Sequence, residues 1–263
     1  MRLSFSTKGW HDRSFETFCE IAKDYGFEGI ELHNIRGGLF ADRDGAFHDY
    51  AAAATVRRLY ESKLDLPCID SICELADTAE AVEELMACLK IAKNLHIPNI
   101  RLRANHAENE AEAIESVASV IGKVLPEAEA CGVTLLLETT GLFCKTSVLR
   151  DMLERFASDY LSALWELSGT YFDGEEMPET VIRNLGAYVR HVHFSDAKKT
   201  ENGLEHCLAG EGELPIKEVM LALRSVNYDG FVSLVWNPEW CEELQDMEII
   251  FAQIGRARVG KEC

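Results

Sequence analysis

The sequence has little that would suit a membrane or a nucleic acid. No segment approaches the ~20 consecutive apolar residues of a membrane span, and no apolar run follows a basic stretch at the amino terminus. Only 26 basic side chains stand against 45 acidic ones, and the net charge of -19 disfavours a phosphate backbone or an anionic membrane surface as partner. We therefore expect a cytoplasmic protein that binds neither nucleic acid nor membrane.

Cysteine is present but is not arranged for cross-linking or for a structural metal. The nine cysteines are an odd number, run from Cys19 to Cys263 and include no Cys-x-x-Cys pair. This pattern argues against a disulfide framework and against a structural zinc site. We expect most of them to be reduced thiols that pack as small hydrophobic side chains.

Nothing in the sequence marks a boundary between domains. There is no low-complexity stretch, no Pro/Ser-rich linker and no long block of like charge. The 263 residues, 47% of them hydrophobic, suffice for one closed α/β barrel, which typically takes roughly 250 residues. We predict a single domain spanning residues 1–263.

Short aliphatic or β-branched runs alternate with longer segments of helical periodicity, as in a parallel sheet covered by helices. The runs predict eight strands, at 2–6, 29–33, 66–72, 98–104, 132–138, 161–167, 189–195 and 229–235. The segments between them predict helices at 14–25, 50–62, 78–95, 108–130, 147–157, 178–185, 216–226 and 242–256. Eight such units favour a (β/α)8 (TIM) barrel over an open sheet, and no Gly-x-Gly-x-x-Gly turn follows the first strand to suggest dinucleotide binding.

Two carboxylates stand at strand ends, where the active-site face of a barrel lies. Glu138 ends the apolar run of the fifth strand, and Glu166 lies between Trp165 and Leu167 on the sixth. A carboxylate in an apolar run is costly to bury unless a cation meets it. Glu138 is therefore either a functional residue or half of a salt bridge to a neighbouring strand, and Glu166 is either functional or turned to solvent.

The seventh strand carries two histidines on one face, because side chains alternate along a strand. His193, nearest the strand end, can meet Glu138 and Glu166 if this face points into the barrel. Two carboxylates and an imidazole suit Mn, Mg, Co or Fe, with zinc possible. The alternative is that His191 and His193 are a structural pair.

The second and fourth strands add further polar pairs. Arg101 and Arg103 share a face, and Arg103 at the strand end could bind a substrate oxyanion bidentately or pair with a site acid. Glu31 and His33 are likewise co-facial, and either could support the ligands without touching the metal.

Taken together, these strand ends resemble the xylose isomerase-like barrel superfamily, which includes sugar (phosphate) isomerases and epimerases and the endonuclease IV-like nucleases. The similarity spans nearly the whole chain, through GFEGIELH, LLLETTG, LWEL, RHVHFSDA, HCLAGEGELPI and YDGFVSLVW. RHVHFSDA with the following LAGEG and Pro215-Ile216 is the most specific part, whereas each motif alone is weak.

The resemblance implies one divalent metal held by a Glu, an acid, a His and a Glu at the ends of the fifth to eighth strands. By position, the first three are Glu138, Glu166 and His193, and the fourth falls on Val235. In members that isomerise or epimerise sugars, the fifth- and eighth-strand Glu residues are also the acid/base pair. Valine has no lone pair and no titratable group, so this arrangement is incomplete here.

Further positions also depart from the superfamily pattern. Gly169, Thr140 and Asn237 stand where a His, a His and a second acid are common, and Glu166 stands where Asp is usual. A compensating ligand could come from a carboxylate just beyond the eighth strand, which leaves Glu239 or Glu242 as candidates.

The leading interpretation is a sugar (phosphate) isomerase or epimerase with a degenerate site for Mn, Mg, Co or Zn. Glu138 is the expected proton-transfer residue, and the expected substrate contacts are Arg103, His33, His191 and Trp236. The alternative is a barrel with attenuated catalysis that binds a sugar-like ligand or a protein partner, and a homo-oligomer is compatible with either. A nuclease would need more metal ligands and a basic groove, and the sequence has neither.

Overall fold

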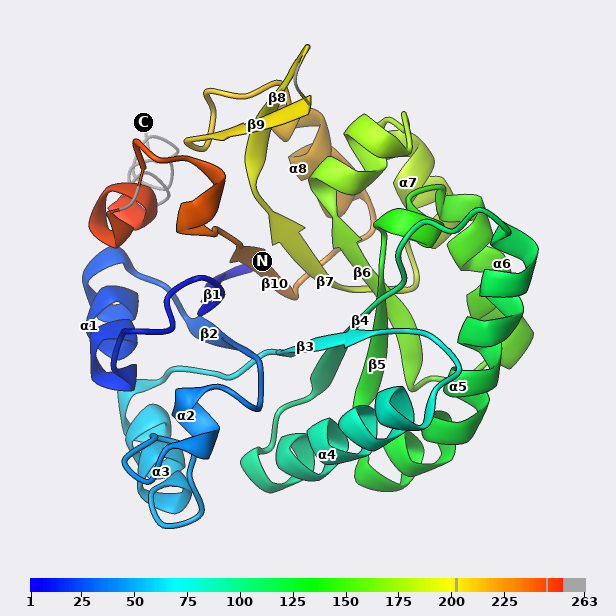
Figure 1. Ribbon diagram of the computed structural model, residues 1–263. Helices are drawn as coiled ribbons and strands as arrows, with labels where there is room; N and C mark the ends of the chain where they lie inside the picture. Colours follow the sequence, from blue (N-terminus) through cyan, green and yellow to red (C-terminus); the bar gives the residue numbers. More distant parts are fainter. Residues whose placement is uncertain (202, 245, 253–263) are drawn as a thin grey trace.

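The computed structural model describes residues 1–201, 203–244 and 246–252, and its parallel strands close into a barrel (Figure 1). Around the ring the order is β1, β10, β7, β6, β5, β4, β3, β2. The strands are β1 (Arg2–Ser6), β2 (Gly29–His33), β3 (Ile69–Glu74), β4 (Asn99–Arg103), β5 (Thr134–Glu138), β6 (Leu161–Glu166), β7 (Val189–Phe194) and β10 (Phe231–Leu234). The predicted (β/α)8 barrel is confirmed.

Helices surround the ring of strands, and their ends follow local sequence signals (Figure 1). Ser14 caps the first helix by accepting from the backbone N–H of Thr17, and Gly26 and Gly132 end two helices in left-handed conformation at φ 72° and 69°. The helices are α1 (Phe15–Tyr25), α2 (Gly38–Ala41), α3 (Ala52–Ser62), α4 (Ala79–Leu95), α5 (Glu110–Cys131), α6 (Thr146–Phe156), α7 (Pro178–Leu185) and α8 (Ile216–Ser225).

The last predicted helix, at 242–256, begins later than expected. Residues 242–243 form a turn, and the described part of the helix covers 247–252. The Asp246 carboxylate accepts from the backbone N–H of Glu248, which is the contact that starts a helix. The predicted end at 256 lies outside the described residues.

A hairpin that the sequence patterns did not indicate follows the seventh barrel strand. It consists of β8 (Asp196–Thr200) and β9 (Gly203–Cys207), which pair antiparallel and extend beyond the ring of strands (yellow in Figure 1). The Asp196 carboxylate accepts from the backbone N–H groups of Gly210, Gly212 and Leu214. A Cβ at Gly212 would overlap this carboxylate, so the loop requires glycine there.

The apolar core has two parts. The large part lies between the strands and the helices and contains aromatic side chains such as Phe5, Phe18 and Trp165. The small part consists of Cys68, Leu136 and Leu164, all fully buried. Leu136 and Leu164 lie two residues before Glu138 and Glu166 and share their strand faces, so this small cluster lies inside the barrel beneath the polar site.

No helix among the described residues has the length and apolar character needed to cross a membrane.

Candidate active site

A polar cavity of about 520 Å³ opens at the carboxyl ends of the strands. Glu138, Glu166 and His193 all line it, so the structure brings the three predicted metal ligands to one pocket. The lining also includes Lys8, Asp70, Arg101, Arg103, Asn105, His106, Thr140, Ser168, His206, Val235 and Trp240.

Glu138 is held by cations on two sides. Its Oε2 accepts from the Arg101 guanidinium at 2.6 Å and from the Thr140 hydroxyl at 2.9 Å, and its Oε1 lies 3.0 Å from His193 Nδ1. Burial alone would raise the pKa of Glu138, but the Arg101 charge and the His193 hydrogen bond outweigh burial and hold this pKa well below its usual range. Glu138 is therefore an ionised carboxylate.

Arg101 is the centre of a buried ion-pair group. The guanidinium is only 6% exposed and also donates to Asp70, while its Nε has no hydrogen-bond partner among the described residues. The predicted alternative for Glu138, a salt bridge to a neighbouring strand, is present. Its partner is Arg101. Arg103, by contrast, forms no ion pair with any described residue, so the alternative role predicted for it is not observed there.

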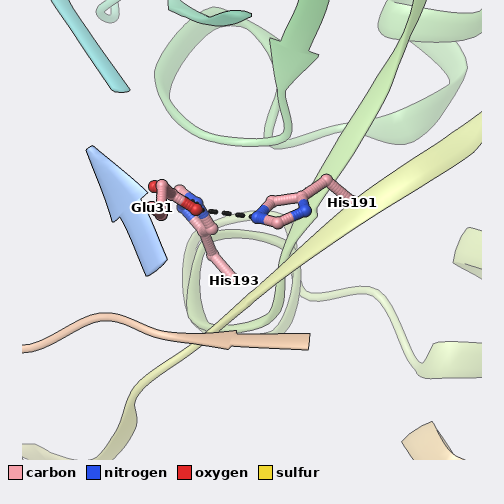
Figure 2. A group of neighbouring side chains, drawn as sticks. All are labelled: Glu31, His191 and His193. Atoms are coloured by element: carbon pink, nitrogen blue, oxygen red, sulfur yellow. Dashed lines mark hydrogen bonds and ion pairs between the residues drawn. The ribbon is translucent and has the colours of Figure 1, made fainter. Parts of the chain in front are cut away.

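Glu31 on β2 contacts two imidazoles of β7, and Figure 2 shows the three side chains as one group. Its Oε2 is 2.7 Å from His191 Nε2, and both of its oxygens are 3.0 Å from His193 Nε2. Burial alone would lower the pKa of His193, but the charge of Glu31 and hydrogen bonds to Glu138 and Glu31 raise it to about 10. His193 is therefore an imidazolium that donates to one carboxylate from each ring nitrogen.

Glu166 has different partners from Glu138. Its oxygens accept from the Ser168 hydroxyl at 2.9 Å and from the backbone N–H of Gly169. Burial raises its pKa, and the nearby charge of Glu138 raises it further. A Cβ at Gly169 would lie 2.6 Å from the Thr139 carbonyl oxygen, so a His cannot replace this glycine without moving the backbone. At 9% exposure Glu166 is not turned to solvent.

Glu31, His191 and His193 could hold a metal ion, because one ligand atom from each lies within 4.8 Å of the others. One carboxylate and two imidazoles are donors that suit zinc and similar divalent ions. Binding there requires His193 to lose its extra proton. The predicted set fits less readily, since Arg101 and His193 engage Glu138, and the Glu166 oxygens face Ser168 and Gly169.

The predicted substrate contacts divide into two groups. Arg103 lines the pocket, whereas His33, His191 and Trp236 do not. His33 Nε2 lies 3.9 Å from an Asp70 oxygen, and Trp236 is buried with its Nε1 donating to the Leu244 carbonyl. The roles proposed for these residues stay predictions.

The eighth barrel strand contributes no replacement carboxylate. Val235 is 7% exposed and lines the pocket. Glu239 and Glu242, the candidates for a ligand folding back, are exposed and do not line it. Glu239 instead lies against Asn237, whose Nδ2 donates to its Oε2 at 3.3 Å.

Several pocket residues lie outside the barrel strands. Lys8 follows β1, His206 lies on β9 of the hairpin, and Trp240 ends the 3-10 helix η3 (Pro238–Trp240). The His206 and Trp240 rings stack with centroids 4.1 Å apart and planes 16° apart, and the Lys8 ammonium lies 5.4 Å from the Trp240 ring centroid. His206 begins the segment HCLAGEGELPI that contributes to the family resemblance, whereas no motif includes Lys8 or Trp240.

Fold and site together define a class: a TIM barrel with an acid- and histidine-rich pocket at the carboxyl ends of its strands. A model of the family described as "Xylose isomerase-like TIM barrel" matches residues 19–251, and the chain belongs to this family.

Known relatives are distant but cover most of the chain. Fructoselysine 3-epimerase of Escherichia coli O157:H7 is 21% identical over 249 residues, covering 89% of this chain and 90% of the epimerase. Among solved structures, the IOLI protein with a bound zinc atom superposes with a TM-score of 0.80 at 14% identity, covering 100% of this chain and 99% of IOLI. D-psicose 3-epimerase with D-fructose has a TM-score of 0.76 at 15% identity, with 100% and 98% coverage. At such identities the structural matches show the fold alone.

Proposed function

We propose that the protein is a sugar isomerase or epimerase that binds a small polyol or keto sugar in the mouth pocket and moves a proton on its carbon skeleton. The main support is the pair Glu138 and Glu166, two carboxyl groups that line one pocket and whose pKa values are shifted in opposite directions. Such a pair assigns roles, because the ionised group accepts a proton and the other can hold one.

In this proposal Glu138 takes the proton from the substrate carbon. Arg101 and Thr140 fix Glu138 Oε2, which leaves the carboxylate oriented by three neighbours before substrate binds. Glu166 holds a proton near a substrate oxygen, with Ser168 fixing its carboxyl group. Glu138 and Glu166 lie on adjacent strands, and Val235 has no proton to give, so transfer along one face of the substrate is favoured. Isomerisation needs only one face, whereas epimerisation needs two.

A divalent metal, when bound, would polarise the carbonyl and hydroxyl oxygens of the sugar. Glu31, His191 and His193 have the donor types to hold it, and Glu138, Glu166 and His193 remain the set that the resemblance implies. The two sets share only His193, so Glu31→Gln and Glu166→Gln separate them by zinc binding measured calorimetrically. The first set predicts loss in Glu31→Gln alone, and the second predicts loss in Glu166→Gln alone.

Exchange of substrate carbon-bound hydrogen with solvent deuterium tests the proton transfer. A panel of aldoses and ketoses of five and six carbons is incubated in D2O and followed by NMR. Glu138→Gln and Glu166→Gln should each lower the exchange rate about 100-fold or more, the usual contribution of a positioned acid or base. Glu242→Gln is the matched control, since this carboxylate is exposed and does not line the pocket. An unchanged rate in folded Glu138→Gln would remove this residue from the reaction.

The second candidate is a barrel that binds a sugar-like ligand without turnover. Val235 at the eighth strand favours it, because the superfamily's usual arrangement has a carboxylate there. Binding of a panel member without any deuterium exchange would select this function.

A further inference from the structure

The mouth pocket contains cations that no acidic side chain neutralises. Arg103 and Lys8 line it, and neither forms an ion pair with any residue that the structure describes. Arg101, by contrast, is paired with both Asp70 and Glu138. The chain has 45 acidic side chains, yet none of those in the described residues forms an ion pair with Arg103 or Lys8.

The acids that face the same pocket have other partners. Asp70 and Glu138 are bonded to Arg101, and the Glu166 oxygens accept from the Ser168 hydroxyl and the backbone N–H of Gly169. Arg103 and Lys8 are therefore left in the lining without an acidic partner among the described residues, and unpaired cations in a cavity attract anions.

The two free cations occupy different parts of the rim. Arg103 ends β4, and the polar side chains of Asn105 and His106 follow it in the lining. Lys8 follows β1, which β2 and β3 separate from β4 in the ring. On the Lys8 side, Trp240 and His206 form a flat aromatic wall, and an aromatic ring face suits the C–H groups of a carbon skeleton.

We propose that the ligand of this pocket is an anionic polyol, a sugar acid or sugar phosphate, whose oxyanion binds Arg103. The planar guanidinium matches a carboxylate or phosphate with two parallel hydrogen bonds, and Asn105 and His106 supply further donors beside it. The carbon skeleton then extends toward the wall of Trp240 and His206. This inference rests on the proposed function for the polyol part of the ligand and adds the charged group.

Isothermal titration of the purified protein tests the charge requirement. The anionic probes are D-gluconate, D-galacturonate, D-glucose 6-phosphate and D-ribose 5-phosphate, the neutral probes are D-glucose, D-galactose and D-ribose, and inorganic phosphate is tested alone. At least one anionic probe should bind tenfold or more tightly than its neutral counterpart, and its affinity should fall between 50 and 200 mM NaCl. The sugar acids and sugar phosphates, compared with each other, identify which oxyanion is preferred.

Variants locate the contact. Arg103→Gln should weaken the anionic probe at least tenfold and the neutral probe less than twofold, while Arg103→Lys should recover part of the loss. Lys8→Gln, acting through the field of the pocket, should cost about threefold. The matched control is Lys90→Gln, an exposed lysine of α4 that is outside the pocket lining.

Three results would overturn the inference: no binding of any anionic probe at 10 mM, equal affinity for neutral and anionic probes, or an unchanged preference in folded Arg103→Gln. Failure of the proposed function looks different. Tight anionic binding without deuterium exchange removes the isomerase proposal and leaves the anion site. Deuterium exchange into neutral sugars, without any preference for anionic probes, would instead support the isomerase proposal and remove the anion site.

Discussion

The two sides of the pocket at the carboxyl ends of the strands differ in how their charged side chains are paired. On the side of β3 to β7, Asp70, Arg101, Glu138 and His193 form a continuous chain of contacts between opposite charges. On the side of β10 and β1, the lining consists of Val235, Trp240 and the free ammonium of Lys8. The first side is therefore an ionic network that forms before any ligand binds. On the second side, Lys8 has no acidic partner among the described residues and can bind a ligand.

The largest expected effect comes from removing the cation of the ionic side. Arg101→Met leaves Asp70 and Glu138 as buried charges without their partner, and breaking a buried pair this way costs about 3–5 kcal/mol. Urea unfolding measures the loss. Arg58→Met provides the control, since the Arg58–Glu16 pair is about half exposed and should be worth about 1 kcal/mol or less. Equal losses in the two variants would contradict the ionic network as a source of stability.

The next effect is a pH dependence that belongs to the same side. The pKa of His193 is raised to about 10 from 6.5, so the stability it adds is complete below pH 6.5 and disappears as the pH rises through 10. Urea unfolding from pH 6 to 10.5, with a chelator present, should show this decline in wild type and a flatter profile in His193→Gln. His106→Gln, which alters an exposed histidine, should keep the wild-type slope.

The contrast between the sides also predicts how a carboxylate added at position 235 changes the metal affinity. Val235→Glu places an acid in the pocket that Glu138 lines and should raise zinc or manganese affinity at least tenfold, about 1.4 kcal/mol, as measured by titration calorimetry. Val232→Glu on the same strand is the control, because Val232 lines a separate apolar cavity instead of the mouth. No gain in Val235→Glu would mean that the pocket has been rebuilt for something other than a metal.

The smallest effect tests a single neutral donor. Thr140→Val removes the hydroxyl that donates to Glu138 Oε2 at 2.9 Å and should cost about 1 kcal/mol in unfolding free energy. The control Thr200→Val changes an exposed hydroxyl on the hairpin, away from the ionic network. A loss as large as that of Arg101→Met would show that Thr140, and not the guanidinium, fixes Glu138.

The barrel was predictable because each of its units has a local signal. The apolar runs that end at Glu138 and the alternation through His191 and His193 specify both the strands and the face that each side chain takes. The contact of His193 with Glu138 follows from strand ends that meet at one rim.

The rest of the site depends on distances in space that no local pattern encodes. Glu31 meets the histidines across β1 and β10, so this contact exists only once the ring has closed. Likewise, the hairpin is held by the Asp196 carboxylate, which accepts from backbone N–H groups of residues 210–214. Neither strand of the hairpin has the apolar run that would have predicted a strand. The exposed turn of 242–243 before the last helix was missed because its charged residues also fit a helical pattern.

The attachment of this hairpin makes it a replaceable part. One carboxylate at the end of the seventh strand anchors the returning loop, and Gly212 is the position that its close approach demands. Mutagenesis that keeps Asp196 and Gly212 can therefore randomise His206 and its neighbours without changing the barrel strands. A library with those two residues fixed would alter the ligand specificity of the pocket while the barrel keeps its folding stability.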